Sequence, residues 1–507
     1  MLFRKLTLLF VVCLFSSAIS FAQKQPRLTY NVEMSANMSS GDYAPLWFTA
    51  NKCGLSSSDP SSGYLRAGLE LNQPLRRGWK IGAGLDLAGT YNSPTPFIVR
   101  QGYFDISWRM LKLSVGSKER SPLGKNPYLS SGGMVEGVNA RPIPQVRAEI
   151  EDYFTVSGTK GWFAFKGHLA YGWFTDGRWQ KDFAGDVHKP YLKKVLYHSK
   201  ALMLKVGNKE KFPLEAEVGL LMAAQFGGEL HSFKKLTDGS YQENVSEMPH
   251  GLKNYAKVFM AQTGGEDTAG GDQVNVEGNH VGSWNAALNY YLGDWKFRVY
   301  YEHFFDDHSQ MFFEYGRWKD GHLGIEITLP KNRFVSTLLW EGLATKDQSG
   351  PILYDGDERF GDASNLAFAG TQISAMDNYY NNYFYQSWQH YGMGIGNPLL
   401  PGPIYNKNGS LVFRSNRVRA NHWAFAGEPT DEWKYRVLMS YALHWGTYEN
   451  PLDNIKNQFS SLYEVTYSPK KLAGWNFSVS AAVDHGSYLG NSTGGMITIR
   501  KEGICIK

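Results

Sequence analysis

The segment "WKIGAGLDLAGTY", residues 79–91, separates into two faces when it is read every second residue. One face is apolar throughout and consists of Trp79, Ile81, Ala83, Leu85, Leu87, Gly89 and Tyr91. The other face carries Lys80, Asp86 and Thr90 among small residues. Because side chains alternate along a β-strand, this pattern predicts a strand with one apolar and one polar face. In a soluble sandwich the apolar face meets a second sheet, whereas in a membrane barrel it meets lipid.

The same alternation recurs along the rest of the chain. It predicts about 18 strands, each bounded by turn residues. They lie at 29–38, 64–73, 79–91, 100–109, 111–118, 145–157, 162–174, 199–207, 214–225, 282–292, 295–305, 319–329, 333–343, 411–427, 433–447, 458–468, 474–484 and 494–506.

Short and long connections alternate between these strands. "QPLRRG" and "PKKLAG" are typical of the short turns, and the longest loops are 119–144, 226–281 and 344–410. Outer-membrane barrels have an even number of tilted strands, with short periplasmic turns and longer outer loops. At about 3.3 Å per residue and a tilt of about 40°, residues 79–91 span roughly 30 Å with an aromatic residue at each end. We therefore predict an all-β protein, a transmembrane antiparallel β-barrel; a secreted β-sandwich or propeller is the alternative.

The first residues predict export. "MLFRKLTLLFVVCLFSSAISFAQ" has a basic start, a short apolar run and small residues at its end. This pattern is typical of a signal peptide, residues 1–22, and the apolar run is too short to favour a membrane anchor. Residues 23–507 are then one outer-membrane β-barrel domain with long extracellular loops. Cys53 and Cys505 remain after processing, and without a spacing pattern two free thiols are favoured over a disulfide.

Composition and motifs argue against other functions. Charged residues make up 20% of the chain and the net charge is +5, which gives no indication of nucleic-acid binding. "GNSTG" around Ser492 matches a nucleophile elbow, but no histidine follows it and a turn is favoured. The acidic loop "YDGDERFGD" offers calcium ligands in Asp355, Asp357 and Asp362 without their regular spacing, so a solvated loop is favoured. We expect no enzyme, no cofactor and no metal site.

Three loop segments resemble the capsule assembly protein Wzi family of the Gram-negative envelope. They are "APLWFTANKCGL" (44–55), "LSSGGMVEGVNARPIPQVR" (129–147) and "NYYNNYFYQSWQHYGMGIGNPLLPG" (378–402). The motif positions are Trp47, Phe48, Asn51, Gly132, Gly133, Asn139, Pro142, Gly396, Asn397 and Pro398.

The resemblance implies a monomeric outer-membrane barrel of about 18 strands, occluded by helices and inward-folded loops. It also implies a surface lectin that helps to hold capsular or exopolysaccharide. Its partners would be this polysaccharide, outer-membrane lipid and other envelope polysaccharide-export proteins. An outer-membrane porin or transporter for small polar solutes is the alternative, because both explain a polar inner face.

One loop combines the residue types that bind sugars. Residues 377–397 hold seven aromatic side chains, and the amides of Asn381, Asn382, Gln386 and Gln389 lie among them. Flat aromatic rings cover the apolar faces of sugars, while neighbouring polar groups bind the hydroxyls. We predict a polysaccharide site made by Trp388, Tyr383, Tyr385 and Gln386, with Arg141 of another outer loop as a cation for an acidic polymer. The alternative is that these aromatic residues pack the loop into a plug over the lumen.

Overall fold

The computed structural model describes residues 26–268, 276–306, 311, 320–354 and 372–506. The predicted signal peptide, residues 1–22, lies outside the described residues, as do the possible calcium ligands Asp355, Asp357 and Asp362.

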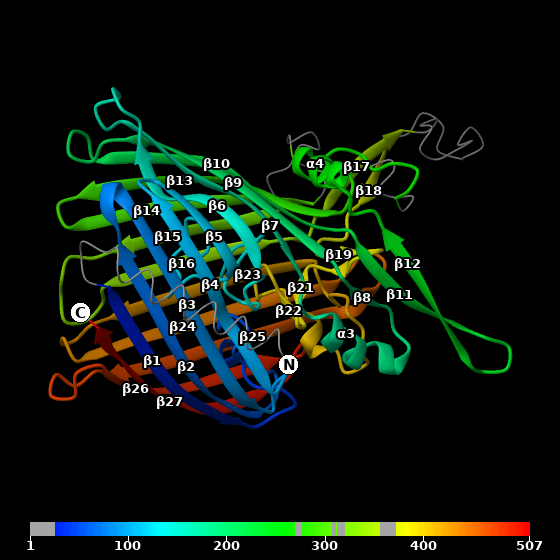
Figure 1. Ribbon diagram of the computed structural model, residues 1–507. Coiled ribbons are helices and arrows are strands. Elements are labelled where there is room, and N and C mark those ends of the chain that lie inside the picture. Colours follow the sequence, from blue (N-terminus) through cyan, green and yellow to red (C-terminus); the bar gives the residue numbers. More distant parts are fainter. Residues whose placement is uncertain (1–25, 269–275, 307–310, 312–319, 355–371, 507) are drawn as a thin grey trace, which may run out of the picture.

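The barrel is one closed 18-stranded antiparallel sheet. Each strand pairs with the next strand of the barrel along the chain, and pairing of the first with the last closes the cylinder (Figure 1). The strands are β1 (Arg27–Ser39), β2 (Ser61–Pro74), β3 (Trp79–Tyr91), β4 (Phe97–Trp108), β5 (Leu111–Ser117), β6 (Gln145–Thr155), β7 (Phe163–Trp173), β9 (Leu196–Gly207), β10 (Leu214–Phe226), β13 (Asn279–Leu292), β14 (Trp295–Asp306), β15 (Gly321–Thr328), β16 (Thr337–Ala344), β23 (Val418–Gly427), β24 (Trp433–Gly446), β25 (Pro451–Tyr467), β26 (Trp475–Gly486) and β27 (Ser492–Ile506). The predicted fold class is confirmed.

The apolar face of each strand points outward. On β3, Trp79 and Leu85 are 42% and 50% exposed, whereas Asp86 is only 5% exposed and faces the lumen. Aromatic residues also gather at the short-turn end of the barrel, where Trp79 lies 6.2 Å from Trp108. A soluble protein rarely exposes so continuous an apolar surface, and an aromatic girdle marks a membrane interface. The outward face therefore contacts lipid.

The two ends of the barrel differ. Tight turns, one of them the 3₁₀ turn η1 (Arg76–Gly78), join the strands at the left of Figure 1, where both ends of the barrel sheet also lie. Longer connections at the other end contain α3 (Gly177–Phe183), η2 (Gly185–Val187), β8 (Tyr191–Lys193), β11 (Gly228–Lys235), β12 (Tyr241–Met248), α4 (Leu252–Met260), β17 (Ser349–Tyr354) and β18 (Gln372–Met376). Among the described helices, none is long and apolar enough to cross a membrane.

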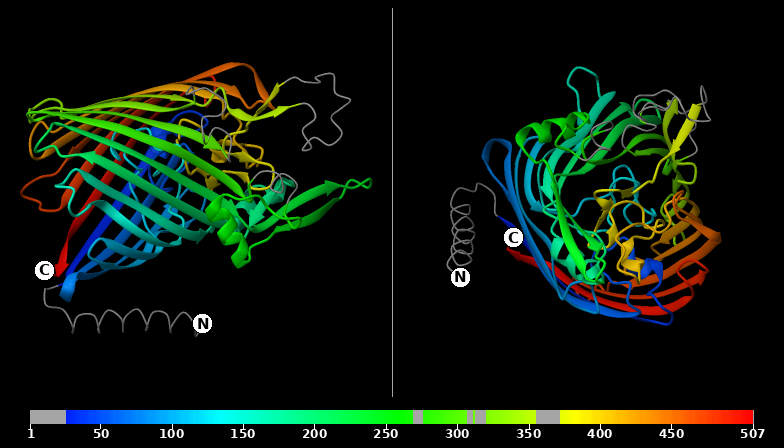
Figure 2. Two further views of the ribbon diagram at one scale, coloured as in Figure 1. Left: turned by 90° about the horizontal axis from the view of Figure 1, so that it is seen from above. Right: turned by 90° about the vertical axis from the view of Figure 1, so that its right-hand side faces the viewer.

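Three connections fold into the lumen, and together we call them the plug: residues 40–60, 118–144 and 377–417 (Figure 2, right). Their short elements are α2 (Leu46–Thr49), β19 (Asn381–Asn382), β20 (Gln386–Ser387), β21 (Gln389–His390), β22 (Met393–Gly394) and η5 (Pro403–Tyr405). The plug and the inner wall share the largest buried apolar cluster of the described chain. Segment 411–417, predicted to begin a strand, instead places Leu411 and Phe413 in the buried interior next to β23.

Candidate functional site

Aromatic side chains form the centre of the plug. Trp388 is completely buried, and its indole N–H donates a 2.8 Å hydrogen bond to the carbonyl of Val135. Its ring stacks on Tyr197 of β9 with 6.2 Å between ring centroids. On the opposite side, Phe304 of β14 packs edge-on against Tyr379 at 4.8 Å. These contacts connect two walls of the barrel through the plug.

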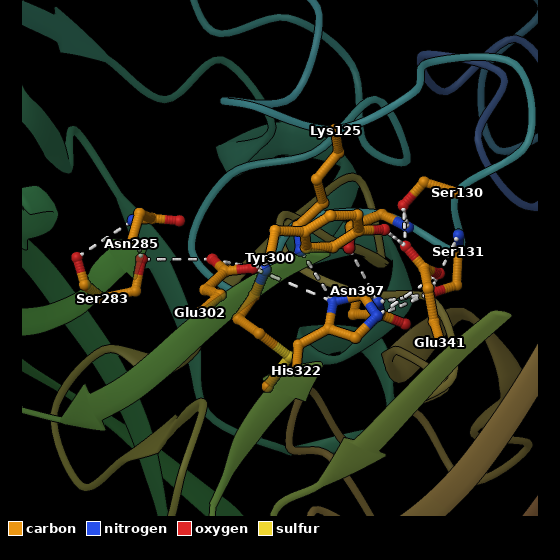
Figure 3. Close-up of polar contacts among 12 residues, drawn as sticks. Lys125, Ser130, Ser131, Ser283, Asn285, Tyr300, Glu302, His322, Glu341 and Asn397 are labelled. Atoms are coloured by element: carbon orange, nitrogen blue, oxygen red, sulfur yellow. Dashed lines mark hydrogen bonds and ion pairs between the residues drawn. The ribbon is translucent and has the colours of Figure 1, made fainter. Parts of the chain in front are cut away.

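A buried carboxylate of the wall binds the plug backbone (Figure 3). Glu341 on β16 accepts hydrogen bonds from the Ser131 N–H at 2.7 Å, the Ser131 hydroxyl at 2.6 Å and the Ser130 hydroxyl at 2.5 Å. The hydroxyl of Tyr300 on β14 donates to the same carboxylate. Hydrogen bonds to an ionised acceptor are stronger than neutral ones, so Glu341 is a strong anchor.

A second carboxylate continues this network. Glu302 on β14 accepts the Met134 N–H at 3.0 Å and pairs with the ammonium of Lys125, also at 3.0 Å. Lys125 further donates to Nδ1 of His322 at 3.0 Å. Because Nδ1 accepts this bond, the ring proton is on Nε2, which lies 3.3 Å from a carboxylate oxygen of Glu341. Buried charges are tolerated only when they are paired and hydrogen-bonded, and here each charge has partners. We call Lys125, Glu302, His322 and Glu341 the latch.

Sequence reasoning missed the latch. A usable signal was present, because the ionisable residues Glu302, His322 and Glu341 occupy three consecutive predicted strands. Ionisable residues on neighbouring inward positions indicate a shared partner in the lumen.

The motif residues join the plug segments to one another. Asn51 donates to the Ser131 carbonyl at 2.9 Å, Asn139 to the Gly394 carbonyl at 2.9 Å, and Asn397 to the Gly132 carbonyl at 3.0 Å. The remaining positions pack at these joints: Trp47 and Phe48 are buried in α2, and Gly132 lies beside Pro398. The Pro142 carbonyl accepts from the Ser117 hydroxyl. Gly133 and Gly396 have no room for a side chain. The motif therefore describes how three chain segments close one lumen.

The predicted sugar-binding residues fall into two groups. Tyr383 is 72% exposed. Gln386 is half-buried beside it, and its side-chain amide donates a 3.4 Å hydrogen bond to the Tyr383 carbonyl. Tyr385 and Trp388 are buried in the plug, so this structure shows them in the packing role. A direct contact of either ring with a glycan stays a prediction that requires the plug to move.

Arg141 lies apart from that loop tip. Segment 118–144 joins β5 to β6 and folds into the lumen, so Arg141 is only 7% exposed instead of lying on an outer loop. Its guanidinium lies 3.9 Å from the ring centroid of Tyr391, a cation–π contact. Burial lowers the pKa of Arg141 to about 10.

Polar contacts fix Tyr391 and its neighbour His390. The Asp176 carboxylate accepts the Tyr391 N–H at 3.0 Å and the Gln389 amide at 3.2 Å. His390 donates from Nδ1 to the Arg141 carbonyl at 3.0 Å, and its Nε2 accepts from the Thr175 hydroxyl at 3.0 Å. Tyr391 and Asp176 were not among the predicted site residues, although Tyr391 lies within the aromatic segment that the sequence singles out.

Two cavities remain beside the plug. A cavity of about 500 Å³ opens among the inner faces of β2–β6 near the short turns, with Lys80, Arg109 and Glu151 in its walls. We call it the vestibule. A smaller cavity of about 120 Å³ lies between segment 118–144 and the wall, and Arg120, Arg141 and Arg147 line it. We call it the inner cavity. No cluster of metal-ligating side chains occurs within the described ranges.

Comparison with known proteins supports the fold. No family model matches the chain, and no curated protein matches its sequence. The structure is similar to Wzi of Escherichia coli, described as a carbohydrate-binding β-barrel involved in group 1 capsule assembly, with a TM-score of 0.52 and 11% identity over 92% of this chain and 83% of that chain. It is also similar to OprD of Pseudomonas aeruginosa, with a TM-score of 0.46 and 8% identity over 96% of this chain and 97% of that one. The protein is an outer-membrane β-barrel.

Proposed function

We propose that the protein is a non-catalytic, lectin-like member of the capsule assembly protein Wzi family that binds polysaccharide and helps to assemble or anchor it on the cell surface. The observation that supports this most is the closed lumen. Three contacts connect the plug to separate strands of the wall: Ser131 with Glu341, Trp388 with Tyr197, and Tyr379 with Phe304. Inward side chains that would line an open channel therefore hold a plug instead.

The plug offers groups suited to sugars. Tyr383 is exposed next to Gln386, and the half-buried ring of Tyr391 lies against the buried guanidinium of Arg141. An aromatic ring beside an amide or a cation combines an apolar surface with hydrogen-bond donors, which is what a sugar ring requires. Wzi of Escherichia coli, which shares this architecture, is described as carbohydrate-binding.

The remaining parts of the proposal follow from export and from the lipid-facing belt. Residues 1–22 act as the signal peptide, and residues 23–507 form a monomeric barrel embedded in outer-membrane lipid. Capsular or exopolysaccharide is the principal partner, and other envelope polysaccharide-export proteins deliver it. Nucleic acid, metal and cofactor have no part in this function.

A porin or transporter for small polar solutes is the second candidate function. The vestibule favours it, because a polar cavity of about 500 Å³ at the short-turn end can admit small solutes. Passage across the barrel would then require the plug to move.

Binding of polysaccharide to the purified protein tests the proposal. The full mature chain, folded in detergent, is screened on an array of capsular and exopolysaccharides. We expect binding to at least one polymer, and about thirtyfold weaker binding for Tyr383→Ala with Tyr391→Ala, because the two lost aromatic contacts are worth about 1 kcal/mol each. Tyr241→Ala is the matched control, since Tyr241 is exposed on β12. Absence of binding by the unaltered protein would refute the proposal.

A further inference from the structure

Arg141 is a buried cation without a carboxylate partner. Among the described residues, no acidic side chain lies within ion-pair distance of its guanidinium, and its Nε and Nη2 atoms have no hydrogen-bond partner. The Asp176 carboxylate favours the charge of Arg141 from beyond that distance, but it already accepts from the Tyr391 N–H and the Gln389 amide. The Tyr391 ring covers one face of the group and compensates part of the lost hydration. A buried charge is unfavourable unless an opposite charge or hydrogen bonds accompany it. These two donors are suited to an anionic group.

The inner cavity next to Arg141 contains further cations. Arg120, Arg147 and Lys118 line it, and the nearby carboxylate of Glu149 is shared, at 2.6 Å from Arg147 and 3.8 Å from Arg120. Lys118 is paired with Asp105 at 2.5 Å. The guanidinium groups of Arg120 and Arg147 thus have only one carboxylate between them within ion-pair distance, apart from residues outside the described ranges.

The acidic side chains that line the inner cavity are already engaged. Glu136 accepts a hydrogen bond from the hydroxyl of Tyr197, and Glu119 forms an ion pair with Arg100. His168 also lines the cavity, and its Nε2 atom contacts the Ser199 hydroxyl at 2.7 Å. The walls therefore offer guanidinium donors and little free acceptor capacity.

The size of the inner cavity suits one small charged group. A volume of about 120 Å³ exceeds the space for a single water molecule, and the three guanidinium groups in its mixed polar and apolar lining favour a hydrated or ionic occupant over a void. Arginine forks match the paired oxygens of carboxylates and phosphates. Lys118 lines both the inner cavity and the vestibule, so the two spaces adjoin.

We infer that the inner cavity binds one carboxylate or phosphate group between Arg120, Arg141 and Arg147, and that the polysaccharide bound by this protein is acidic. The first part concerns the cavity alone. The second part rests on the proposed function, because it takes a sugar carboxylate as the source of the anion.

Calorimetric titration of the detergent-folded full mature chain tests the first part. Sodium glucuronate, inorganic phosphate and glucose are titrated separately. We expect saturable binding of glucuronate, no binding of glucose, and at least tenfold weaker binding of glucuronate to Arg141→Gln. Arg109→Gln is the control, because Arg109 lines the vestibule and not the inner cavity. The shift in electrophoretic mobility on boiling shows that each variant has folded.

The outcomes separate the possible sources of the anion. Binding of neither glucuronate nor phosphate overturns the inference, and so does binding that Arg109→Gln abolishes and Arg141→Gln leaves unchanged. Binding of phosphate alone supports an anion cavity and overturns its assignment to a sugar carboxylate.

Polymers test the second part. We expect retention of alginate, a polyuronate, by the immobilised protein and its loss in Arg141→Gln, with no retention of dextran. Retention of dextran without any binding of glucuronate overturns this inference and leaves the proposed function standing. If the protein binds glucuronate but retains no polymer of the array, the result supports the anion cavity and contradicts the proposed function.

Discussion

The Ser131 N–H donates a 2.7 Å hydrogen bond to the Glu341 carboxylate, and this bond joins the plug to the barrel wall. Both residues are buried. Without the plug, water would hydrate this carboxylate, whereas in the closed lumen the donors of Ser130 and Ser131 replace that water. Closure of the lumen therefore depends on these hydrogen bonds.

Replacing Glu341 by Gln should loosen the plug and leave the barrel folded. The amide removes the charge and places its N–H₂ near the Ser131 N–H, so at least one buried donor loses its acceptor, which costs about 1–3 kcal/mol. We expect faster swelling of liposomes in arabinose for Glu341→Gln than for the unaltered protein.

Glu428→Gln is the control for that experiment, because Glu428 is exposed and, among the described residues, forms its ion pair with Lys434 alone at 3.0 Å. Equal swelling rates for all three proteins would show that the latch does not hold the plug.

Trp388 and Tyr383 should affect different properties although they lie in one loop. Trp388→Ala leaves a cavity in the centre of the plug and should lower the free energy of unfolding by about 3–5 kcal/mol. Tyr383→Ala changes an exposed side chain and should alter it by no more than about 0.5 kcal/mol while weakening polysaccharide binding. Calorimetry of the folded proteins measures the first effect. A stable Trp388→Ala variant that had lost binding would instead place Trp388 in the sugar site.

Acid should loosen the plug around His390. Burial lowers the pKa of the His390 imidazole; nearby Asp176 and the hydrogen bond to the Arg141 carbonyl oppose this shift, and the charge of Arg141 adds to it. The folded protein then keeps His390 neutral where the unfolded chain is protonated, so this contribution to stability is complete above about pH 6.5 and decreases as the pH falls below that value.

Amide hydrogen exchange of residues 386–397 at pH 5 and pH 7.5 measures this effect. Exchange corrected for its intrinsic pH dependence should be faster at pH 5, and the difference should shrink in His390→Gln. An unchanged difference in that variant would assign the effect to another group.

The strands could be predicted because lipid and lumen act on alternate side chains. On β3, the apolar Trp79 and Leu85 face lipid and the charged Asp86 faces the lumen, and this difference appears in the sequence as a period of two residues. The hairpin of β11 and β12 was missed because β12 is exposed on both faces apart from Met248, so nothing imposes an alternation. The sequence predicts that segment 411–417 begins a strand, because the apolar Leu411 and Phe413 are two residues apart. In the structure both side chains are buried because this segment belongs to the plug.

The candidate site was harder to predict than the fold. Aromatic rings beside amides suit a sugar site and a plug equally well, because both need flat apolar surfaces with hydrogen bonds at their edges. Only the tertiary contacts distinguish Trp388, whose indole binds the Val135 carbonyl, from the exposed Tyr383. The latch depends on contacts between Lys125 of the plug and the wall residues Glu302 and His322, which lie far from it in the chain, and no pattern within one segment predicts such contacts.

Conductance of the unaltered protein in planar lipid bilayers tests the central claim most directly, because a barrel closed by a latched plug and a diffusion channel differ in this property above all. The mature chain is inserted from detergent, and insertion is verified by heat-modifiable mobility of the recovered protein. We predict almost no steady current in 1 M KCl, and measurable current only after Glu341→Gln. A steady conductance of the unaltered protein would contradict the account and favour a channel.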